Sequence, residues 1–103
     1  GGAKIVKELE KEQKSRTTRM VRDYLDRALL DIATLFRDVL LVQSNSLDSI
    51  INTDLISEIT KVAETTTPEA TLAKLEAIMS ARTNLSHNAA PLLTIEALMV
   101  LLK

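Results

Sequence analysis

The run LLTIEALMVLL, from Leu92 to Leu102, is the sequence feature that most constrains the fold. Nine of its eleven residues are apolar, and only Thr94 and Glu96 are polar. On an α-helix, with about 100° between successive residues, these apolar side chains cover nearly every side. Such a helix is about 17 Å long, which is too short for the roughly 30 Å of a membrane's hydrocarbon. We therefore expect protein, and no membrane, to surround it.

The composition favours a single all-α domain. The chain has 103 residues, and its only aromatic residues are Tyr24 and Phe36. It has no cysteine, which rules out a disulfide, a thiolate nucleophile and a cysteine-based zinc site, and which fits a reducing, cytoplasmic location. We interpret Gly1 and Gly2 as residues left from cloning. We expect a small helical bundle of four to five helices with a long projecting first helix.

The first predicted helix has two different halves. Upstream of residue 20, the stretch EKEQKSRTTR at 10–19 has good helix propensity but no apolar side chain. A helix from Lys4 to Gln43 is about 60 Å long, whereas a compact domain of this size has a radius of gyration of about 13 Å. We therefore expect residues 1–19 to project, as a helix or linker, from a helical domain of residues 20–103. From residue 20 onward, apolar side chains recur at helical spacing: Met20, Tyr24, Ala28, Leu29, Ile32, Leu35, Phe36, Val39 and Leu40.

A polar connection, SNSLDSIINTD at 44–54, follows the first helix. We expect its apolar residues, Leu47, Ile50 and Ile51, to lie tucked beneath it. Asn52 or Thr53 is then predicted to cap a second helix. The apolar positions of that helix follow the 3.6-residue period: Leu55, Ile56, Ile59, Val62 and Ala63.

The stretch TTTPEA gives the clearest helix start in the chain. Thr67 suits the N-cap, Pro68 the first turn, and Glu69 the positive end of the helix dipole. This third helix should end near His87 or Asn88, because asparagine tolerates the left-handed backbone conformation, and Pro91 suits the start of a fourth helix. Its apolar positions are Leu72, Leu75, Ala77, Ile78, Met79, Ala81 and Leu85.

The fourth helix, drawn on a helical wheel, separates into two faces. The larger apolar face, which we expect to seal the bundle, contains Ile95, Leu98, Met99 and Leu102. A smaller strip, called here the outer strip, is predicted to be a partner interface and consists of Leu93, Glu96, Ala97 and Val100. Alternatively, Glu96 pairs with Arg37 or Arg82.

The sequence suggests no catalytic, cofactor-binding or metal-binding set. His87 is the single histidine, and we expect it to be solvated at a helix end, where the negative dipole favours it. The acids near the middle of the first helix interleave with Arg22 and Arg27, so a salt-bridged outer face is expected rather than paired catalytic carboxylates or ligands. The acids concerned are Asp23, Asp26 and Asp31.

One basic stretch, KSRTTRMVR, offers a second candidate contact surface. The net charge is +3 over residues 4–27, from eight basic and five acidic residues, and −4 over residues 28–103, from five and nine. Guanidinium groups on one helical side suit phosphates or an acidic partner, although without interleaved aromatics we do not expect nucleic acid as the main partner. A solvated linker helix is the alternative. The candidate residues are Lys14, Arg16, Arg19 and Arg22.

Four segments together carry a family resemblance: SRTTRMVRDYLDRALLDI, FRDVLLVQ, IINTDL and ARTNLSHNAAPLLTIEALMVLL. They resemble the C-terminal domain of the delta-prime subunit of the bacterial DNA polymerase III clamp loader, most closely the actinobacterial form. The related tau/gamma subunit is the alternative within the family. Ala90 departs from the asparagine that the family often has. The matching positions are Arg37, Asp38, Leu40, Asn52, Asp54, Asn88, Leu92, Ile95, Glu96 and Leu98.

The resemblance implies a bundle of about five helices that forms one segment of a collar, the ring that holds the loader pentamer together. Its expected partners are the other loader subunits, delta and tau/gamma, and its expected activity is assembly rather than catalysis. An independent helical adaptor, which binds nucleic acid or an acidic partner through the basic first helix, is the alternative of a different class.

Overall fold

The computed structural model describes residues 1–87 and 90–103 and confirms an all-α fold. Its first helix, α1 (Gly2–Gln43), is much longer than the others. The remaining α-helices are α2 (Ile56–Thr65), α3 (Pro68–Ser86) and α4 (Pro91–Leu101). Two 3₁₀ turns, η1 (Leu47–Ser49) and η2 (Thr53–Leu55), lie between α1 and α2.

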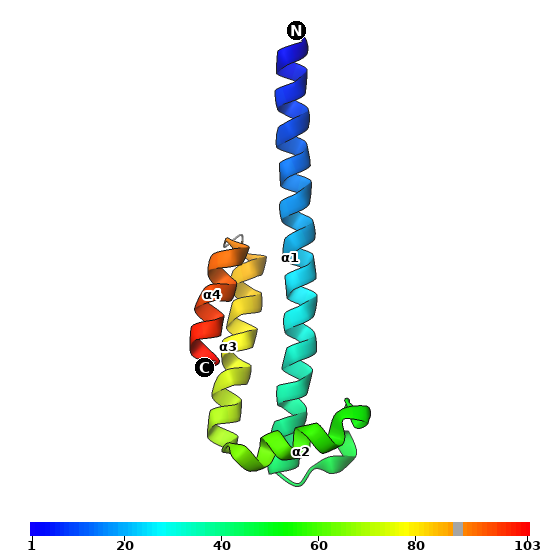
Figure 1. Ribbon diagram of the computed structural model, residues 1–103, viewed down its shortest axis with the longest axis vertical. Helices are drawn as coiled ribbons and strands as arrows, with labels where there is room; N and C mark the ends of the chain where they lie inside the picture. Colours follow the sequence, from blue (N-terminus) through cyan, green and yellow to red (C-terminus); the bar gives the residue numbers. More distant parts are fainter. Residues whose placement is uncertain (88–89) are drawn as a thin grey trace.

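The first helix projects far beyond the bundle, as the sequence predicted (Figure 1). The molecule measures 66 × 25 × 18 Å, and its radius of gyration is 18.5 Å, well above the value of about 13 Å for a compact domain of this length. Residues 1–21 are all exposed, because no other helix runs alongside them. We call residues 2–21 of α1 the projecting segment.

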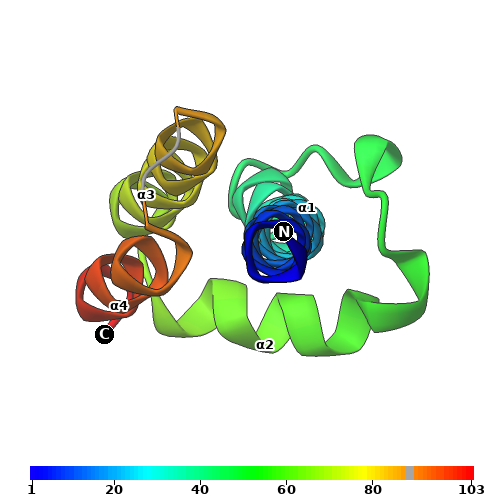
Figure 2. The same ribbon diagram turned by 90° about the horizontal axis from the view of Figure 1, so that it is seen from above.

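The bundle is built on the second half of α1. There α3 runs back alongside α1, α4 returns along α3, and α2 crosses the end of α1 (Figures 1 and 2). Buried apolar side chains form two separate clusters, which agrees with the thin core expected of a chain this short. One cluster joins α1, α3 and α4 through Leu29, Ala33, Ile78, Ala81, Leu85 and Leu98, and the other joins α1 and α2 through Val39, Ile59 and Ala63.

The apolar stripe of α1 reaches the core later than predicted. Met20 and Tyr24 belong to the predicted stripe, but their side chains are 67% and 75% exposed. Met20 lies in the part of α1 that projects beyond α3. Tyr24 lies beside the end of α3 but on a side of α1 that the described residues leave exposed, since Arg22 and Leu25 next to it are partly buried. Contact with the core cluster begins at Leu25.

Local signals end α1 and begin α3. Asn45 adopts the left-handed conformation, with φ of 59°, which directs the chain away from the end of α1. Gln43 donates hydrogen bonds to the backbone oxygens of Ala63 and Thr66, at 3.2 and 3.1 Å, and so ties the end of α1 to the end of α2. The predicted cap of α3 is confirmed, since the Thr67 hydroxyl accepts a hydrogen bond from the Ala70 N–H at 3.1 Å.

The connection between α1 and α2 differs from the prediction. Leu47 and Ile51 do not lie beneath it, since they are 54% and 57% exposed, and only Ile50 is partly buried. Neither Asn52 nor Thr53 caps α2, which begins at Ile56 without a side-chain cap. The physical reason is that the polar groups of this loop are directed toward α1, so its apolar side chains are left on the outside.

The end of α3 and the start of α4 agree with the prediction where the structure describes them. The last residue of α3 is Ser86, its C-cap is His87, and Pro91 begins α4. The predicted left-handed conformation of Asn88 lies outside the described residues.

Candidate partner interface

The outer strip of α4 is exposed along its whole length. Leu93 and Val100 are each 67% exposed, and Glu96 and Ala97 between them are also exposed. The helix is covered on one side only, because it packs mainly against α3 and touches α1 slightly (Figures 1 and 2). The domain itself therefore covers only one side of this apolar helix, and the other sides stay exposed to solvent.

The buried face of α4 is rotated relative to the predicted one. Leu98 is buried, and Ile95 and Leu102 are partly buried, as expected. Met99, which was also placed inward, is 59% exposed, and Leu92 next to that face is 73% exposed. The inward face instead includes Thr94, whose hydroxyl donates to the Ala90 carbonyl at 3.0 Å.

The apolar surface of α4 is consequently wider than the outer strip. Because α4 has essentially one neighbour, only a narrow face becomes buried and the flanking leucine and methionine remain outside. The additional exposed apolar residues on this helix are Leu92, Met99 and Leu101.

The alternative pairing of Glu96 with Arg37 or Arg82 is wrong. Arg82 forms a two-point ion pair with Asp26, in which Nε donates to Oδ1 at 2.9 Å and Nη2 to Oδ2 at 3.3 Å. Arg37 donates to the backbone oxygen of Ser49 at 3.2 Å. Both arginines thus have partners within the bundle, and Glu96 stays on the outer strip.

The ion pair of Asp26 and Arg82 joins α1 to α3, although the sequence placed Asp26 on a salt-bridged outer face. Hydrogen bonding from Arg82 is the main cause that lowers the pKa of the Asp26 carboxyl. Burial opposes this effect, and the guanidinium charge adds a further, smaller lowering. The predicted outer pair does form between Arg27 and Asp31, at 3.7 Å with both side chains largely exposed. Such an exposed pair contributes little stability.

The four basic candidates do not share one surface. Lys14, Arg16 and Arg19 are exposed on the projecting segment, and Arg16 pairs with Glu12 at 3.3 Å. Arg22 lies at the bundle, where it lines a cleft between α1 and α3 and its Nε atom is buried without a hydrogen-bond partner among the described residues. The projecting segment therefore presents three of the four basic residues to a ligand.

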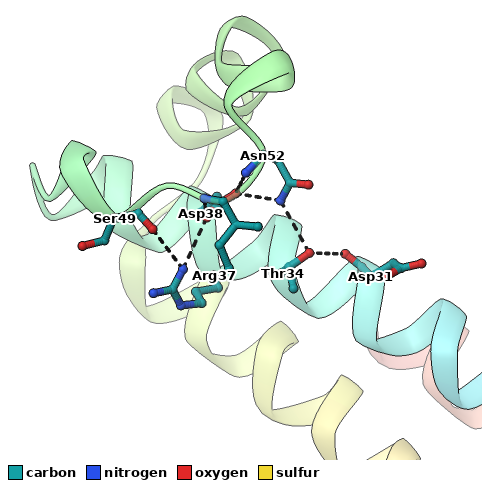
Figure 3. A network of polar contacts seen from close by, with 7 residues as sticks. Asp31, Thr34, Arg37, Asp38, Ser49 and Asn52 are labelled. Carbon is teal, nitrogen blue, oxygen red and sulfur yellow. Dashed lines mark hydrogen bonds and ion pairs between the residues drawn. The ribbon is translucent and has the colours of Figure 1, made fainter.

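The carboxylate of Asp38, which the sequence analysis named only among the positions of the family resemblance, accepts three hydrogen bonds. Asp38 is fully buried, and its carboxylate accepts hydrogen bonds from the Ile51 N–H at 3.0 Å and the Asn52 N–H at 2.8 Å. The Asn52 side chain donates a third, at 2.7 Å (Figure 3). The network fastens the loop to α1 and so fixes the outward direction of Leu47 and Ile51.

The titration of Asp38 reflects this arrangement. Burial is the largest single effect and raises the pKa of the Asp38 carboxyl. The hydrogen bonds from Ile51 and Asn52 and the nearby charge of Arg37 lower the pKa, and together they outweigh burial, so the pKa lies below the ordinary aspartate value. Asp38 is therefore a structural anion. The sequence did carry one signal for it, an acid directly before the apolar run VLLV at 39–42.

A groove between α1 and α2 is a second apolar surface, which the sequence reasoning missed. Its lining is apolar except for Glu58. Val62 is 45% exposed and Ile32 is 38% exposed, so the groove opens to solvent. The principal lining residues are Ile32, Leu35, Phe36, Leu55, Ile59 and Val62.

The described residues hold no cluster of three or more histidine, cysteine, aspartate or glutamate side chains that could bind a metal ion. His87 is exposed at the end of α3, where the sequence placed it. Among the described helices, none has the length and apolar character needed to cross a membrane.

These features define an all-helical domain that presents an apolar helix to the outside. The family model described as DNA polymerase III, delta subunit, C terminal, matches residues 6–102, and the chain belongs to this family. Searches of curated proteins and of solved structures found no match. The family membership confirms the resemblance to the C-terminal domain of a DNA polymerase III clamp-loader subunit. A domain of this family interacts with other subunits of DNA polymerase III.

Proposed function

We propose that this domain is one segment of the collar of a bacterial DNA polymerase III clamp loader, with the role of holding the loader pentamer together in the cytoplasm during DNA replication. Within the family, we assign it to the delta-prime subunit of actinobacterial type, with delta and tau/gamma as its neighbours. Its activity is then assembly, and the chemistry of the loader belongs to other domains.

The exposed apolar face of α4 is the observation that carries this proposal. Transfer of a leucine or valine side chain from water to an interface contributes about 1.5–3 kcal/mol, so Leu93 and Val100 together favour association by several kcal/mol before its costs. A neighbouring subunit supplies the cover that α3 leaves incomplete. Glu96 borders the apolar side chains of the strip and orients the partner through a polar contact.

A segment of a ring needs a second surface for its other neighbour. The groove between α1 and α2 is suited to this, because it is apolar, open and formed by different helices from the outer strip. The Asp38 network keeps the adjoining loop in one conformation, which reduces the entropy that would be lost on docking.

Residues 1–19 are proposed as the joint to a nucleotide-binding domain of the same subunit. They add no apolar side chain to the bundle core, and their exposed helix provides a rigid connection. The collar segment then comprises residues 20–103.

A different class of function, an adaptor for nucleic acid or an acidic partner, depends on the basic residues of α1. Lys14, Arg16 and Arg19 are exposed to such a partner, although Arg16 already pairs with Glu12, whereas Arg22 lies against α3. Within the family, the alternative is a collar domain of the tau/gamma subunit. Such a domain also needs two contact surfaces but has different neighbouring subunits.

Competition in trans tests the proposal. The 103-residue chain, added in excess to the separated subunits of the loader, should compete with the full-length subunit and reduce the yield of assembled pentamer on size-exclusion chromatography. This effect should change little between about 50 and 200 mM salt, because apolar contact drives it, whereas binding through several phosphates would weaken by orders of magnitude. No competition at any salt concentration, or competition that salt abolishes, would contradict the collar assignment.

A further inference from the structure

Glu96 is surrounded by exposed apolar side chains on the surface of α4. On an α-helix, the nearest surface neighbours of a residue are those three and four positions away in either direction. For Glu96 these are Leu92, Leu93, Met99 and Val100, and their side chains are 73%, 67%, 59% and 67% exposed. We call these four residues the apolar ring. Glu96 is the one charged residue of α4, so the ring encloses a single carboxylate.

The carboxylate of Glu96 is solvated in the isolated domain. Its side chain is exposed, and none of the ion pairs formed within the described part of the chain includes it. Water therefore stabilises the negative charge while α4 is uncovered. The situation changes when a partner covers the apolar ring, because the water around the carboxylate is then displaced as well.

A partner that covers the apolar ring must also accommodate the charge of Glu96. Contact between the ring and another apolar surface is favourable, but removal of water from an unpaired carboxylate opposes it. A basic side chain at the matching position of the partner offsets this loss, because it forms a charge-assisted hydrogen bond with the carboxylate as the water leaves. The pattern on α4 therefore fits an apolar surface that carries a positive charge at its middle.

A second copy of this chain does not meet this requirement. A twofold contact centred on Glu96 would set the two apolar rings against each other, and it would also bring both Glu96 carboxylates into one interface. A head-to-tail contact would bring Glu96 to the groove between α1 and α2, whose lining includes a single charged residue, Glu58. In both arrangements two negative charges share an interface from which water is displaced, and this disfavours association.

We propose that the face of α4 binds a subunit that presents an arginine or a lysine from within an apolar surface, and that Glu96 determines this choice of partner. The inference rests on the proposed collar function. The apolar ring supplies most of the affinity, and Glu96 supplies specificity, because a partner without the basic residue leaves the carboxylate buried and unpaired. An ion pair enclosed by apolar side chains is screened little by salt, which agrees with the weak salt dependence expected of collar assembly.

Three substitutions of Glu96 in the full-length subunit test this pairing through the dissociation constant for the rest of the loader. Glu96→Gln should raise this constant by at least about tenfold, and Glu96→Lys by at least about a hundredfold, because lysine repels the partner's base. Glu96→Leu should also raise it by at least about tenfold, although leucine extends the apolar surface, because the partner's base is then buried without an acid. Asp48→Lys, an exposed charge reversal in η1 away from α4, is the matched control and should bind like the wild type (Figure 2).

Glu96→Leu is the decisive variant. A Glu96→Leu subunit that assembles as tightly as the wild type, or more tightly, would overturn the proposal, because no base would then be left unpaired. If Leu93→Asp/Val100→Asp still weakens assembly in that case, the collar contact through α4 stands and only the basic partner is wrong. Unimpaired assembly of both variants would contradict the collar contact itself.

Sedimentation equilibrium of the 103-residue chain tests the exclusion of a second copy. The wild-type chain should stay monomeric up to about 100 µM, and Glu96→Leu should lower the dissociation constant for self-association by at least about tenfold, because it removes the repulsion between carboxylates. Circular dichroism should show that this variant retains its helices. A wild-type dimer that Leu93→Asp/Val100→Asp abolishes would place a second copy on this face and overturn the proposal.

Discussion

Asn52 donates two hydrogen bonds to the buried carboxylate of Asp38, one from its backbone nitrogen at 2.8 Å and one from its side-chain nitrogen at 2.7 Å. A third bond comes from the Ile51 N–H at 3.0 Å. One side chain on α1 thus satisfies two successive backbone donors of a loop that has little regular structure of its own. The position of that loop, and of the apolar residues it exposes, depends on this contact.

Replacement of Asp38 by alanine should be among the more destabilising single changes in the bundle. It leaves the N–H groups of Ile51 and Asn52 without their acceptor, and we expect the free energy of unfolding to fall by about 2–4 kcal/mol. Urea denaturation followed by circular dichroism measures this loss. Asp31→Ala, at an exposed position on the same helix, is the control and should change stability by less than about 0.5 kcal/mol. Equal effects of the two substitutions would show that the network does not hold the loop.

Stability should fall in acid because Asp26 and Asp38 both have lowered pKa values in the folded state. Each contribution is complete above the unfolded value of about 3.9 and is lost as pH falls from there through the lower folded-state pKa. The urea midpoint should therefore be steady between pH 7 and 5 and decline below about pH 4. In Asp38→Asn the urea midpoint should decline less steeply with falling pH. The difference in stability between this variant and the wild type should therefore become smaller in acid. A deficit that is the same at pH 7 and pH 3 would show that the ionised carboxylate is not the stabilising species.

The helices of this domain could be predicted because their signals are local. Thr67 and Pro68 mark the start of α3 within two residues, and the apolar period identifies α1 without knowledge of its neighbours. The role of Asp38 could not be predicted in this way, since its partners lie 13 and 14 residues away in a loop without periodicity. A helical wheel treats Asp38 as one more polar residue of an amphipathic helix.

The orientation of α4 shows a second limit of sequence reasoning. The wheel correctly groups the residues that share a side, but it does not determine how the helix is rotated on its neighbour. That rotation left Met99 outside and brought Thr94 inside. The exposure of the outer strip could be predicted because the strip lies on the side of α4 opposite Leu98. A modest rotation of the helix moves the boundary between its buried and exposed faces but does not reach that side. Its use as an interface stays a prediction.

Substitution within α4 distinguishes the buried face from the exposed one. Leu98→Ala should cost about 2–5 kcal/mol, because Leu98 lies in the cluster shared by α1, α3 and α4 and its truncation leaves a cavity. Met99→Ala, at the adjacent position, removes a side chain that is 59% exposed and should cost less than about 0.5 kcal/mol. Chemical denaturation measures both. A larger loss of stability for Met99→Ala than for Leu98→Ala would show that Met99 is buried and would contradict the orientation of α4 described above.

Limited proteolysis should separate the projecting segment from the bundle. Trypsin, applied to a dilute solution of the chain, should cleave between Lys4 and Arg19 before it cleaves at Lys61, because residues 1–21 are exposed and make no core contact. Mass spectrometry of the early products identifies the cut. First cleavage at Lys61 would indicate that α2, rather than the projecting segment, opens most readily.

The central claim is that the outer strip of α4 joins this domain to a neighbouring subunit, and the affinity of the full-length subunit for the rest of the loader tests it most directly. Leu93→Asp/Val100→Asp should raise the dissociation constant by at least about tenfold, while circular dichroism of the 103-residue chain stays unchanged. Leu47→Asp/Ile51→Asp, at similarly exposed apolar positions away from α4, is the matched control and should assemble like the wild type. Unimpaired assembly of the Leu93→Asp/Val100→Asp subunit would contradict the account.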